Sequence, residues 1–328
     1  MAYMPVAFTP TEPTSSAALR GVLPPVVLPM TSGGEVDSTS LQSHVSHLVA
    51  AGVHGLWANG ATGEFYALDS ELRAEVVRQC VKAAAGRVPV VAHVGDTSTR
   101  LAVRHAREAL AAGATFVSVL PPYFVGFNQE ELKRHFRSIA QAVGGPVLAY
   151  HLPHLIPATL NIDSIVELTV EGVLCGAKDS GSNMVWFRQL QRRLRGAGVS
   201  LPCLTGGSSV ADLGYLLGAV GSVSSIGNLT PGHLVRQYEA AEQEDWTLVL
   251  ALQEQSEDLI ERLNPPGSTP GPGLTATVYK YVLAQQGQIE ADHSAAPLTQ
   301  LTSDDRRYLD EHVLPVVDRL EGPSGQHR

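Results

Sequence analysis

Eight short apolar runs, each followed by a stretch with helical spacing, constrain the fold of this chain more than any other feature. The runs are apolar on successive residues, as expected for strands that are covered on both faces. In the stretches between them, apolar residues recur every three or four positions, which favours amphipathic helices. The expected strands are 21–30, 54–60, 88–95, 115–122, 146–153, 173–180, 201–207 and 221–228, and the expected helices are 40–51, 69–85, 97–112, 128–143, 161–171, 183–195, 208–219 and 231–245.

Residues that begin and end helices support these boundaries. Side chains of Asp, Asn and Thr cap free amides at a helix start, and glycine adopts the left-handed conformation that ends a helix. Eight strand–helix units in about 225 residues predict a (β/α)8 barrel, with a doubly wound open sheet as the alternative. The expected N-caps are Asp69, Thr97, Asn128 and Asn161, and the expected stops are Gly52, Gly86, Gly113 and Gly144.

The alternation covers only the middle of the chain. Residues 1–18 are rich in Pro, Ser and Thr without periodicity, and predict a flexible N-terminal extension. The barrel is expected over 19–245. Residues 246–328 hold helical patterns separated by proline-rich links, and predict a helical appendage that packs on the barrel rather than a second catalytic domain.

Composition excludes several classes of function. The 328 residues include 23 cationic and 32 acidic ones, for a net charge of −9. This balance argues against a nucleic-acid or anionic-membrane partner. No apolar run reaches the roughly 20 residues of a membrane span, and the N-terminus lacks the basic start and apolar core of a signal peptide. Three widely spaced cysteines indicate neither disulfides nor a zinc site. We therefore expect a soluble cytoplasmic enzyme.

Lys178 is the strongest candidate for chemistry. The chain has four lysines, and Lys178 lies at the end of an apolar strand, where barrel enzymes carry their active sites. A lysine at its ordinary pKa near 10.4 is only about 0.04% neutral at pH 7, but desolvation lowers that pKa and creates an amine able to attack a ketone. The alternative is a structural ion pair with the neighbouring Asp179.

Two further features lie at strand ends. The loop 60–64, Gly-Ala-Thr-Gly-Glu, offers backbone N–H groups and the Thr62 hydroxyl as a nest for a carboxylate or phosphate, although an ordinary turn has the same composition. Tyr150 ends the fifth expected strand. It is placed to move a proton, or else packs with a solvated hydroxyl.

Metal and nucleotide sites are not expected. His44 and His47, and likewise His151 and His154, are spaced like ligand pairs, but no third ligand follows at a recognisable spacing. The glycine-rich and nucleophile motifs of dinucleotide, phosphate and acyl chemistry are absent from the sequence.

Together these segments resemble the dihydrodipicolinate synthase / N-acetylneuraminate lyase family, the pyruvate-type class I aldolases. The resemblance covers about residues 20–320. It implies a TIM barrel with a C-terminal helical region, commonly a tetramer built as a dimer of dimers, and no metal or organic cofactor. The matching motifs are GATGE at 60–64, PPYF at 121–124 with NQEEL at 128–132, YHLP at 150–153, GAKDSG at 176–181 and GAVGSVSSIGN at 218–228.

The resemblance assigns roles residue by residue. Lys178 matches the lysine that forms a Schiff base with the 2-oxo acid substrate. Tyr150 matches the tyrosine that moves protons to and from that substrate. Thr62, with the backbone N–H of Ala61, matches the clamp on the pyruvate carboxylate. Two positions that line the pyruvate pocket in the family are matched by Gly206 and Val223.

The departures from the family pattern concern the second substrate. Ala61 and Phe124 stand where the synthases have hydroxyl groups of a proton relay, and Leu155 stands where they have the arginine that binds the aldehyde substrate's carboxylate. The acidic residues of sialic-acid lyases after strand seven are replaced by Gly207, Ser208 and Ser209. Synthesis of dihydrodipicolinate is therefore not expected. The relay proton has three open routes: water, the substrate hydroxyl or His151.

The resemblance implies a class I aldolase that cleaves a 2-oxo acid, such as a 2-keto-3-deoxy sugar acid or a 4-hydroxy-2-oxo acid, to pyruvate and an aldehyde. Three alternatives stay open. They are a dehydratase acting on the same imine, a dihydrodipicolinate synthase, and a relative that binds pyruvate without turnover.

Overall fold

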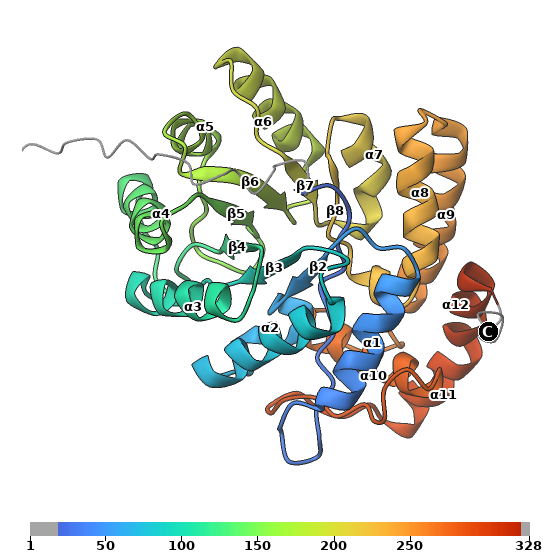
Figure 1. The fold of residues 1–328 in the computed structure, drawn as a ribbon. Helices are drawn as coiled ribbons and strands as arrows, with labels where there is room; N and C mark the ends of the chain where they lie inside the picture. The colour runs from blue at the N-terminus through green and yellow to red at the C-terminus, as the bar shows by residue number, and fades with distance from the viewer. Residues whose placement is uncertain (1–18, 323–328) are drawn as a thin grey trace, which may run out of the picture.

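Eight parallel strands form the centre of the molecule, surrounded by helices (Figure 1). The structure is a computed structural model and describes residues 19–322, so the extension predicted at 1–18 lies outside the described residues. The order of hydrogen-bonded strands is β1-β8-β7-β6-β5-β4-β3-β2. The strands are β1 (Gly21–Val22), β2 (Leu56–Ala58), β3 (Val90–His93), β4 (Phe116–Val119), β5 (Val147–His151), β6 (Leu174–Asp179), β7 (Cys203–Thr205) and β8 (Gly221–Ser222).

One helix follows each of the strands β2 to β8, and α1 follows the segment that contains β1. Four short 3₁₀ turns lie in three of the loops: η2 (Ala61–Gly63) and η3 (Phe65–Ala67) after β2, η4 (Ser208–Val210) after β7 and η5 (Ser225–Asn228) after β8. The helices of the barrel are α1 (Ser38–Ala50), α2 (Ser70–Ala84), α3 (Thr99–Ala111), α4 (Gln129–Val143), α5 (Ile162–Val170), α6 (Met184–Gly196), α7 (Ala211–Leu216) and α8 (Pro231–Glu242).

The barrel closes between β1 and β2, although no regular ladder joins them. The His54 amide donates to the Val22 carbonyl at 2.8 Å, and the Trp57 amide donates to the Pro24 carbonyl at 3.0 Å. Prolines 24 and 25 have no N–H, so the expected strand 21–30 shortens to two regular residues. These bonds confirm the TIM barrel and exclude the open sheet.

Most of the expected helix boundaries are confirmed. Asp69, Asn128 and Asn161 each accept a hydrogen bond from a first-turn amide, and the expected stop glycines all have positive φ angles. The prediction that Thr97 is an N-cap is wrong. The amide and the hydroxyl of Thr97 both donate to Asp96, and the N-cap of α3 is Ser98. The expected helix 208–219 divides into η4 and the shorter α7.

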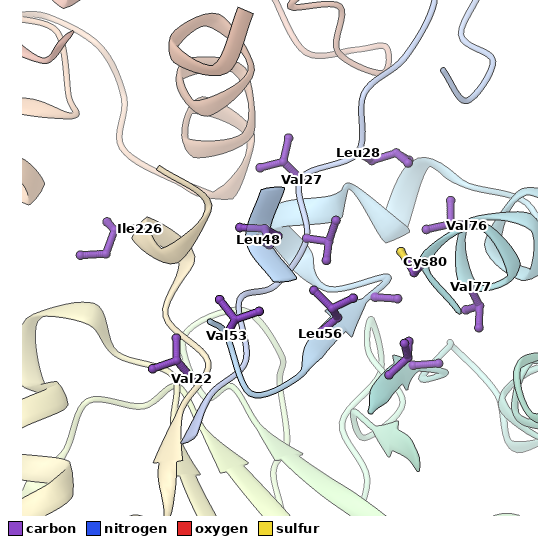
Figure 2. Close-up of a cluster of buried hydrophobic side chains, with 14 of the residues drawn as sticks. Val22, Val27, Leu28, Leu48, Val53, Leu56, Val76, Val77, Cys80 and Ile226 are labelled. Carbon is purple, nitrogen blue, oxygen red and sulfur yellow. The ribbon is translucent and has the colours of Figure 1, made fainter. Parts of the chain in front are cut away.

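Apolar side chains form two layers on the two sides of the strands. The outer layer lies between strands and helices. Figure 2 shows Leu56 of β2 among side chains of α1 and α2. The inner layer fills the barrel, because alternate residues of each strand point inward. Its buried members are Leu19, Leu23, Trp57, Val91, Phe116, Leu148, Leu204 and Val223.

The C-terminal helices pack on the barrel rather than apart from it. Leu259 of α9 and Val278 of α10 belong to the same apolar cluster as the outer layer of the barrel. A separate boundary at 245/246 therefore stays a prediction. Among the described residues, no helix is both long and apolar enough to cross a bilayer. The C-terminal helices are α9 (Trp246–Arg262), α10 (Pro272–Gln285), α11 (Ser303–His312) and α12 (Leu314–Glu321).

Candidate active site

Lys178 and Tyr150 lie side by side on the inner face of the barrel. They are register partners on the neighbouring strands β6 and β5. Tyr150 follows the interior residue Leu148 by two positions, so the period of two in a strand directs it inward. The Lys178 Nζ atom is 4.4 Å from the centroid of the Tyr150 ring and 4.9 Å from that of Trp57. The amine is thus held between two aromatic rings.

The ion pair considered for Lys178 and Asp179 does not form. Consecutive strand residues point to opposite faces, so Asp179 lies on the outer side of β6. Its Oδ1 atom is 2.8 Å from His151 Nδ1 and accepts a hydrogen bond from the Gly181 amide at 2.8 Å. Within residues 19–322, no carboxylate forms a salt bridge with Lys178. That alternative is wrong, and Lys178 has no anion to keep it protonated.

Burial sets the protonation of both inward groups. Lys178 is 3% exposed, and desolvation lowers its pKa to about 7. Roughly half of such a group is the neutral amine at pH 7. Desolvation raises the pKa of Tyr150 to about 12, opposed in part by a hydrogen bond with Ser180. The lysine is therefore available as a nucleophile, and the tyrosine keeps its proton.

The loop after β2, which was expected to form a nest, begins as a 3₁₀ turn. Ala61 and Thr62 lie in the 3₁₀ turn η2, and Thr62 is buried. Glu64 ends this turn in the left-handed conformation at φ 55°. A Cβ on Gly63 would approach the Val26 carbonyl to 2.9 Å, so glycine is required for this close packing. The loop follows the carboxyl end of β2 and Lys178 lies near the carboxyl end of β6, so both lie at the same end of the parallel barrel.

Gly206 and Val223 complete the inner wall at the next strands. A Cβ on Gly206 would lie 2.9 Å from Lys178 Cε and 2.1 Å from Ser180 Oγ. The glycine therefore leaves the space that the lysine chain occupies. Val223 belongs to the inner apolar layer, and its amide donates to the Thr205 carbonyl at 2.7 Å.

Three residues join this group without having been assigned a role from the sequence. Trp57 contacts Lys178, Ser180 contacts Tyr150, and the ring of His93 is 5.6 Å from that of Tyr150. The only sequence feature that could have placed His93 and Ser180 in the site is that both are polar residues at strand ends. Trp57 lies in an apolar run like those of the other strands, so nothing in the sequence indicated its contact with Lys178.

His44, His151 and His154 contact groups other than Lys178 and Tyr150. His151 lies on the outer side of β5, where it contacts Asp179 and stacks on Trp186 at 4.0 Å between centroids. It is therefore the wrong residue for a relay with Tyr150. His44 Nε2 is 3.0 Å from Asn228 Oδ1, and His154 Nε2 is 3.1 Å from the Gly181 carbonyl. In the described part of the chain, no three His, Cys, Asp or Glu side chains are grouped to hold a metal ion.

The residues that depart from the family pattern lie at the rim. Phe124 is 91% exposed and Leu155 is 51% exposed, so neither side chain fills the barrel. Phe124 has a positive φ of 84°, a conformation that is uncommon for a bulky residue. The structure thus leaves both apolar side chains exposed to solvent.

Comparison with known proteins agrees with this geometry. The sequence matches the Dihydrodipicolinate synthetase family over residues 18–314. The chain belongs to this family. This membership confirms the resemblance read from the motifs.

Individual members of the dihydrodipicolinate synthetase family show how close the match is. An uncharacterised DapA-like lyase of Halobacterium salinarum is 32% identical, and the match covers 89% of this chain and 92% of that protein. A 4-hydroxy-tetrahydrodipicolinate synthase of Phenylobacterium zucineum is 38% identical over 72% of this chain and 79% of its own. The solved structure of dihydrodipicolinate synthase from Bacteroides thetaiotaomicron superposes with a TM-score of 0.83 at 28% identity, covering 92% and 99% of the two chains.

Proposed function

We propose that this protein is a lysine Schiff-base lyase that cleaves a 2-oxo acid to pyruvate and an aldehyde. Members of its family are lyases and aldolases of the Schiff-base type. One observation carries the proposal: Lys178 is buried between Trp57 and Tyr150 without a carboxylate partner, and its pKa is about 7. A buried amine of this kind is an activated nucleophile.

The reaction begins when neutral Lys178 attacks the C2 ketone and water leaves, forming a protonated imine. Cleavage of the C3–C4 bond then sends its electron pair into the imine, which gives an enamine instead of a free carbanion. Thr62 and the Ala61 N–H bind the carboxylate and so orient the ketone toward the lysine. Tyr150 exchanges protons with the bound acid. Gly206 and Val223 shape the wall against the pyruvyl group.

The substrate class is a 2-oxo acid with a hydroxyl group at C4, such as a 2-keto-3-deoxy sugar acid or a 4-hydroxy-2-oxo acid. Leu155, an exposed apolar residue, supplies no cation for a second carboxylate. A dehydratase on the same imine and a pyruvate-binding relative without turnover remain distinguishable by product analysis. We propose no metal or organic cofactor for any of these reactions.

A second candidate is 4-hydroxy-tetrahydrodipicolinate synthase, because a relative with that name is 38% identical. We expect little product from pyruvate and aspartate semialdehyde in a coupled reductase assay, since Leu155 cannot pair with the aldehyde's carboxylate. Efficient synthesis in that assay would instead favour this candidate.

Covalent trapping tests the proposal directly. Pyruvate with borohydride should add mass to the peptide that carries Lys178, and Lys178→Ala should abolish the adduct. Lys82→Ala is the matched control and should label normally. An adduct on Lys82 or Lys280 instead, or no adduct at all, would overturn the assignment. Pyruvate detection over a panel of C4-hydroxylated 2-oxo acids then identifies the substrate.

We further propose a cytoplasmic homotetramer, built as a dimer of dimers, that has neither nucleic-acid nor membrane partners. The exposed apolar residues Phe124 and Val125 at the barrel mouth support an apolar contact between copies. Light scattering at micromolar concentration tests it, and a monomer there would contradict it.

A further inference from the structure

His93 is a second basic residue that reaches the interior of the barrel near Lys178. It is the last residue of β3 and follows the interior residue Val91 by two positions, so it points inward. Its ring is 5.6 Å from that of Tyr150 and 4.6 Å from that of Phe65, edge to face in both cases. His93 is 1% exposed, and on its other side it lines a small cavity with Arg73, His105 and Glu108.

Unlike the other buried histidines, His93 has no satisfied ring nitrogen. Neither of its nitrogens has a hydrogen-bond partner of good geometry among the described residues. By contrast, His135 Nδ1 is 2.9 Å from Thr99 Oγ1 and His233 Nε2 is 2.9 Å from the Leu252 carbonyl. Burying an imidazole without a partner is costly unless a ligand or water completes the site. Apart from the Ser118 backbone, the ring nitrogens of His93 are thus left open to a polar ligand or a water molecule.

The charges around His93 keep it neutral. Its pKa lies well below the ordinary value because of burial and the nearby cations Arg73 and Lys178, with a smaller effect of His105, and the Ser118 backbone only partly opposes this fall. Asp96 does not counter these cations at His93, since it is turned to Arg73 at 3.4 Å and to His105 at 3.0 Å. His93 is thus a free base at pH 7.

Tyr150 alone cannot hold the proton that the reaction releases. With a pKa of about 12, its phenol is already protonated and accepts a second proton only as it gives up its own. Asp179 and His151 are engaged with each other on the other side of the strands. His93 is the neutral base on the inner side, in contact with Tyr150.

We propose that His93 is a further catalytic residue, which accepts the C4 hydroxyl proton of the bound 2-oxo acid and later returns it through Tyr150. This inference rests on the proposed lyase function. In the cleavage step, the proton of the C4 hydroxyl passes to the imidazole. The electron pair of that O–H bond becomes the second bond of the aldehyde carbonyl. The electron pair of the C3–C4 bond moves into the imine. Tyr150 then donates its proton to C3 of the enamine, and the imidazolium of His93 reprotonates Tyr150.

The electrostatics of the site favour this sequence. The protonated imine on Lys178 is a cation close to His93, and it opposes an imidazolium there. Cleavage neutralises that imine as the enamine forms, so the positive charge moves to His93 at the moment when the opposing cation disappears. The site therefore carries one positive charge before and after the step.

Pyruvate alone is a sufficient probe. In D₂O the reverse of the last step exchanges the pyruvate methyl protons, which NMR follows without knowledge of the aldehyde. His93→Gln and His93→Phe should slow exchange at saturating pyruvate by about 10²-fold or more, the range for an acid–base group, while borohydride trapping on Lys178 persists. His135→Gln, which removes a buried neutral histidine outside the barrel interior, should exchange at the parent rate.

The pH profile separates this role from packing. At saturating pyruvate Lys178 is already an imine, so the acid limb of the exchange rate reports His93 and should vanish in His93→Gln. Exchange within about threefold of the parent rate, or an unchanged acid limb, would overturn the proposal. Loss of trapping in both His93 variants would also overturn it, because His93 would then act before the enamine forms. Failure of the parent enzyme to trap pyruvate would instead refute the lyase function itself.

Discussion

At the scale of single residues, the presence or absence of a carboxylate partner distinguishes Lys178 from the other buried lysines. Lys280 is completely buried but forms an ion pair with Glu64, and the buried Lys133 pairs with Glu130 and Glu167. Lys178 is buried to the same degree, but aromatic rings take the place of a carboxylate. Desolvation therefore lowers the pKa of Lys178 without compensation, which suits the nucleophilic role that we propose for it.

The pH dependence of imine formation should report this amine. Only the neutral form of Lys178 attacks the ketone, and its pKa is lowered to about 7. The value of kcat/KM, and the rate of trapping at low pyruvate, should therefore rise with pH and level off above about pH 7–8. Initial rates between pH 5 and 10 measure this. A rise that continues toward pH 10 would mean that the amine keeps its ordinary pKa.

Tyr150 and Thr62 should fail in different ways. Tyr150→Phe keeps the packing of the ring and removes a proton carrier, so kcat should fall by about 10²–10⁴ while trapping survives. Thr62→Val removes the proposed carboxylate contact, which would act equally in the ground and transition states, so KM should rise more than kcat falls. Steady-state kinetics on a cleaved 2-oxo acid distinguishes the two patterns. Near-parental kcat in Tyr150→Phe would remove Tyr150 from the mechanism.

At the scale of elements, strand alternation divides the polar residues between two environments. On β5 and β6 it directs Tyr150 and Lys178 into the barrel and His151 and Asp179 outward.

Local capping stabilises the ends of the helices behind the strands. Asn128 accepts from the Glu131 amide while the Glu131 side chain accepts from the Asn128 amide, which forms a capping box.

Removing this cap should cost stability and leave catalysis unchanged. Asn128→Ala leaves the Glu131 amide in the first turn of α4 without its side-chain partner and should lower the free energy of unfolding by about 1 kcal/mol. Gln141→Ala, an exposed change on the same helix, should alter it by less than about 0.5 kcal/mol. Urea titrations of both variants give the comparison. Equal stability of the two would show that the box contributes nothing.

At the scale of the whole molecule, one buried ion pair joins the C-terminal helices to the loop that we propose binds the substrate carboxylate. Lys280 of α10 pairs with Glu64 at the end of η2, and both side chains are inaccessible to solvent. Lys280 also donates to the His293 carbonyl at 2.8 Å, and Glu64 accepts from the Ala295 amide at 2.7 Å. The C-terminal region therefore supports the loop that contains Thr62.

Removing one charge of this pair should lower the free energy of unfolding more than removing both charges. Lys280→Met leaves a buried carboxylate unpaired and should cost about 3–5 kcal/mol of unfolding free energy. The double variant Glu64→Gln/Lys280→Met removes both charges and retains an oxygen for the Ala295 amide, so it should lose less. Denaturant unfolding of the two variants tests the order. A double variant as unstable as Lys280→Met would show that charge is not the cause.

The sequence by itself determined the features that depend on near neighbours in the chain. The eight apolar runs, the caps at Asp69 and Asn128, and the position of Lys178 at a strand end all follow from local periodicity and local hydrogen bonding. The motif at 60–64 also carried the family resemblance that the comparison confirmed. These features needed no information about which segments meet in space.

Only the tertiary structure decided which groups meet. The expected strand 21–30 closes the barrel through irregular bonds around Pro24, and the charge partner of Glu64 comes from Lys280, more than 200 residues away. Whether Lys178 pairs with Asp179, and whether His93 or His151 stands beside Tyr150, depends on strand orientation and register. A shift of one residue reverses both outcomes, because each step along a strand moves a side chain to the opposite face.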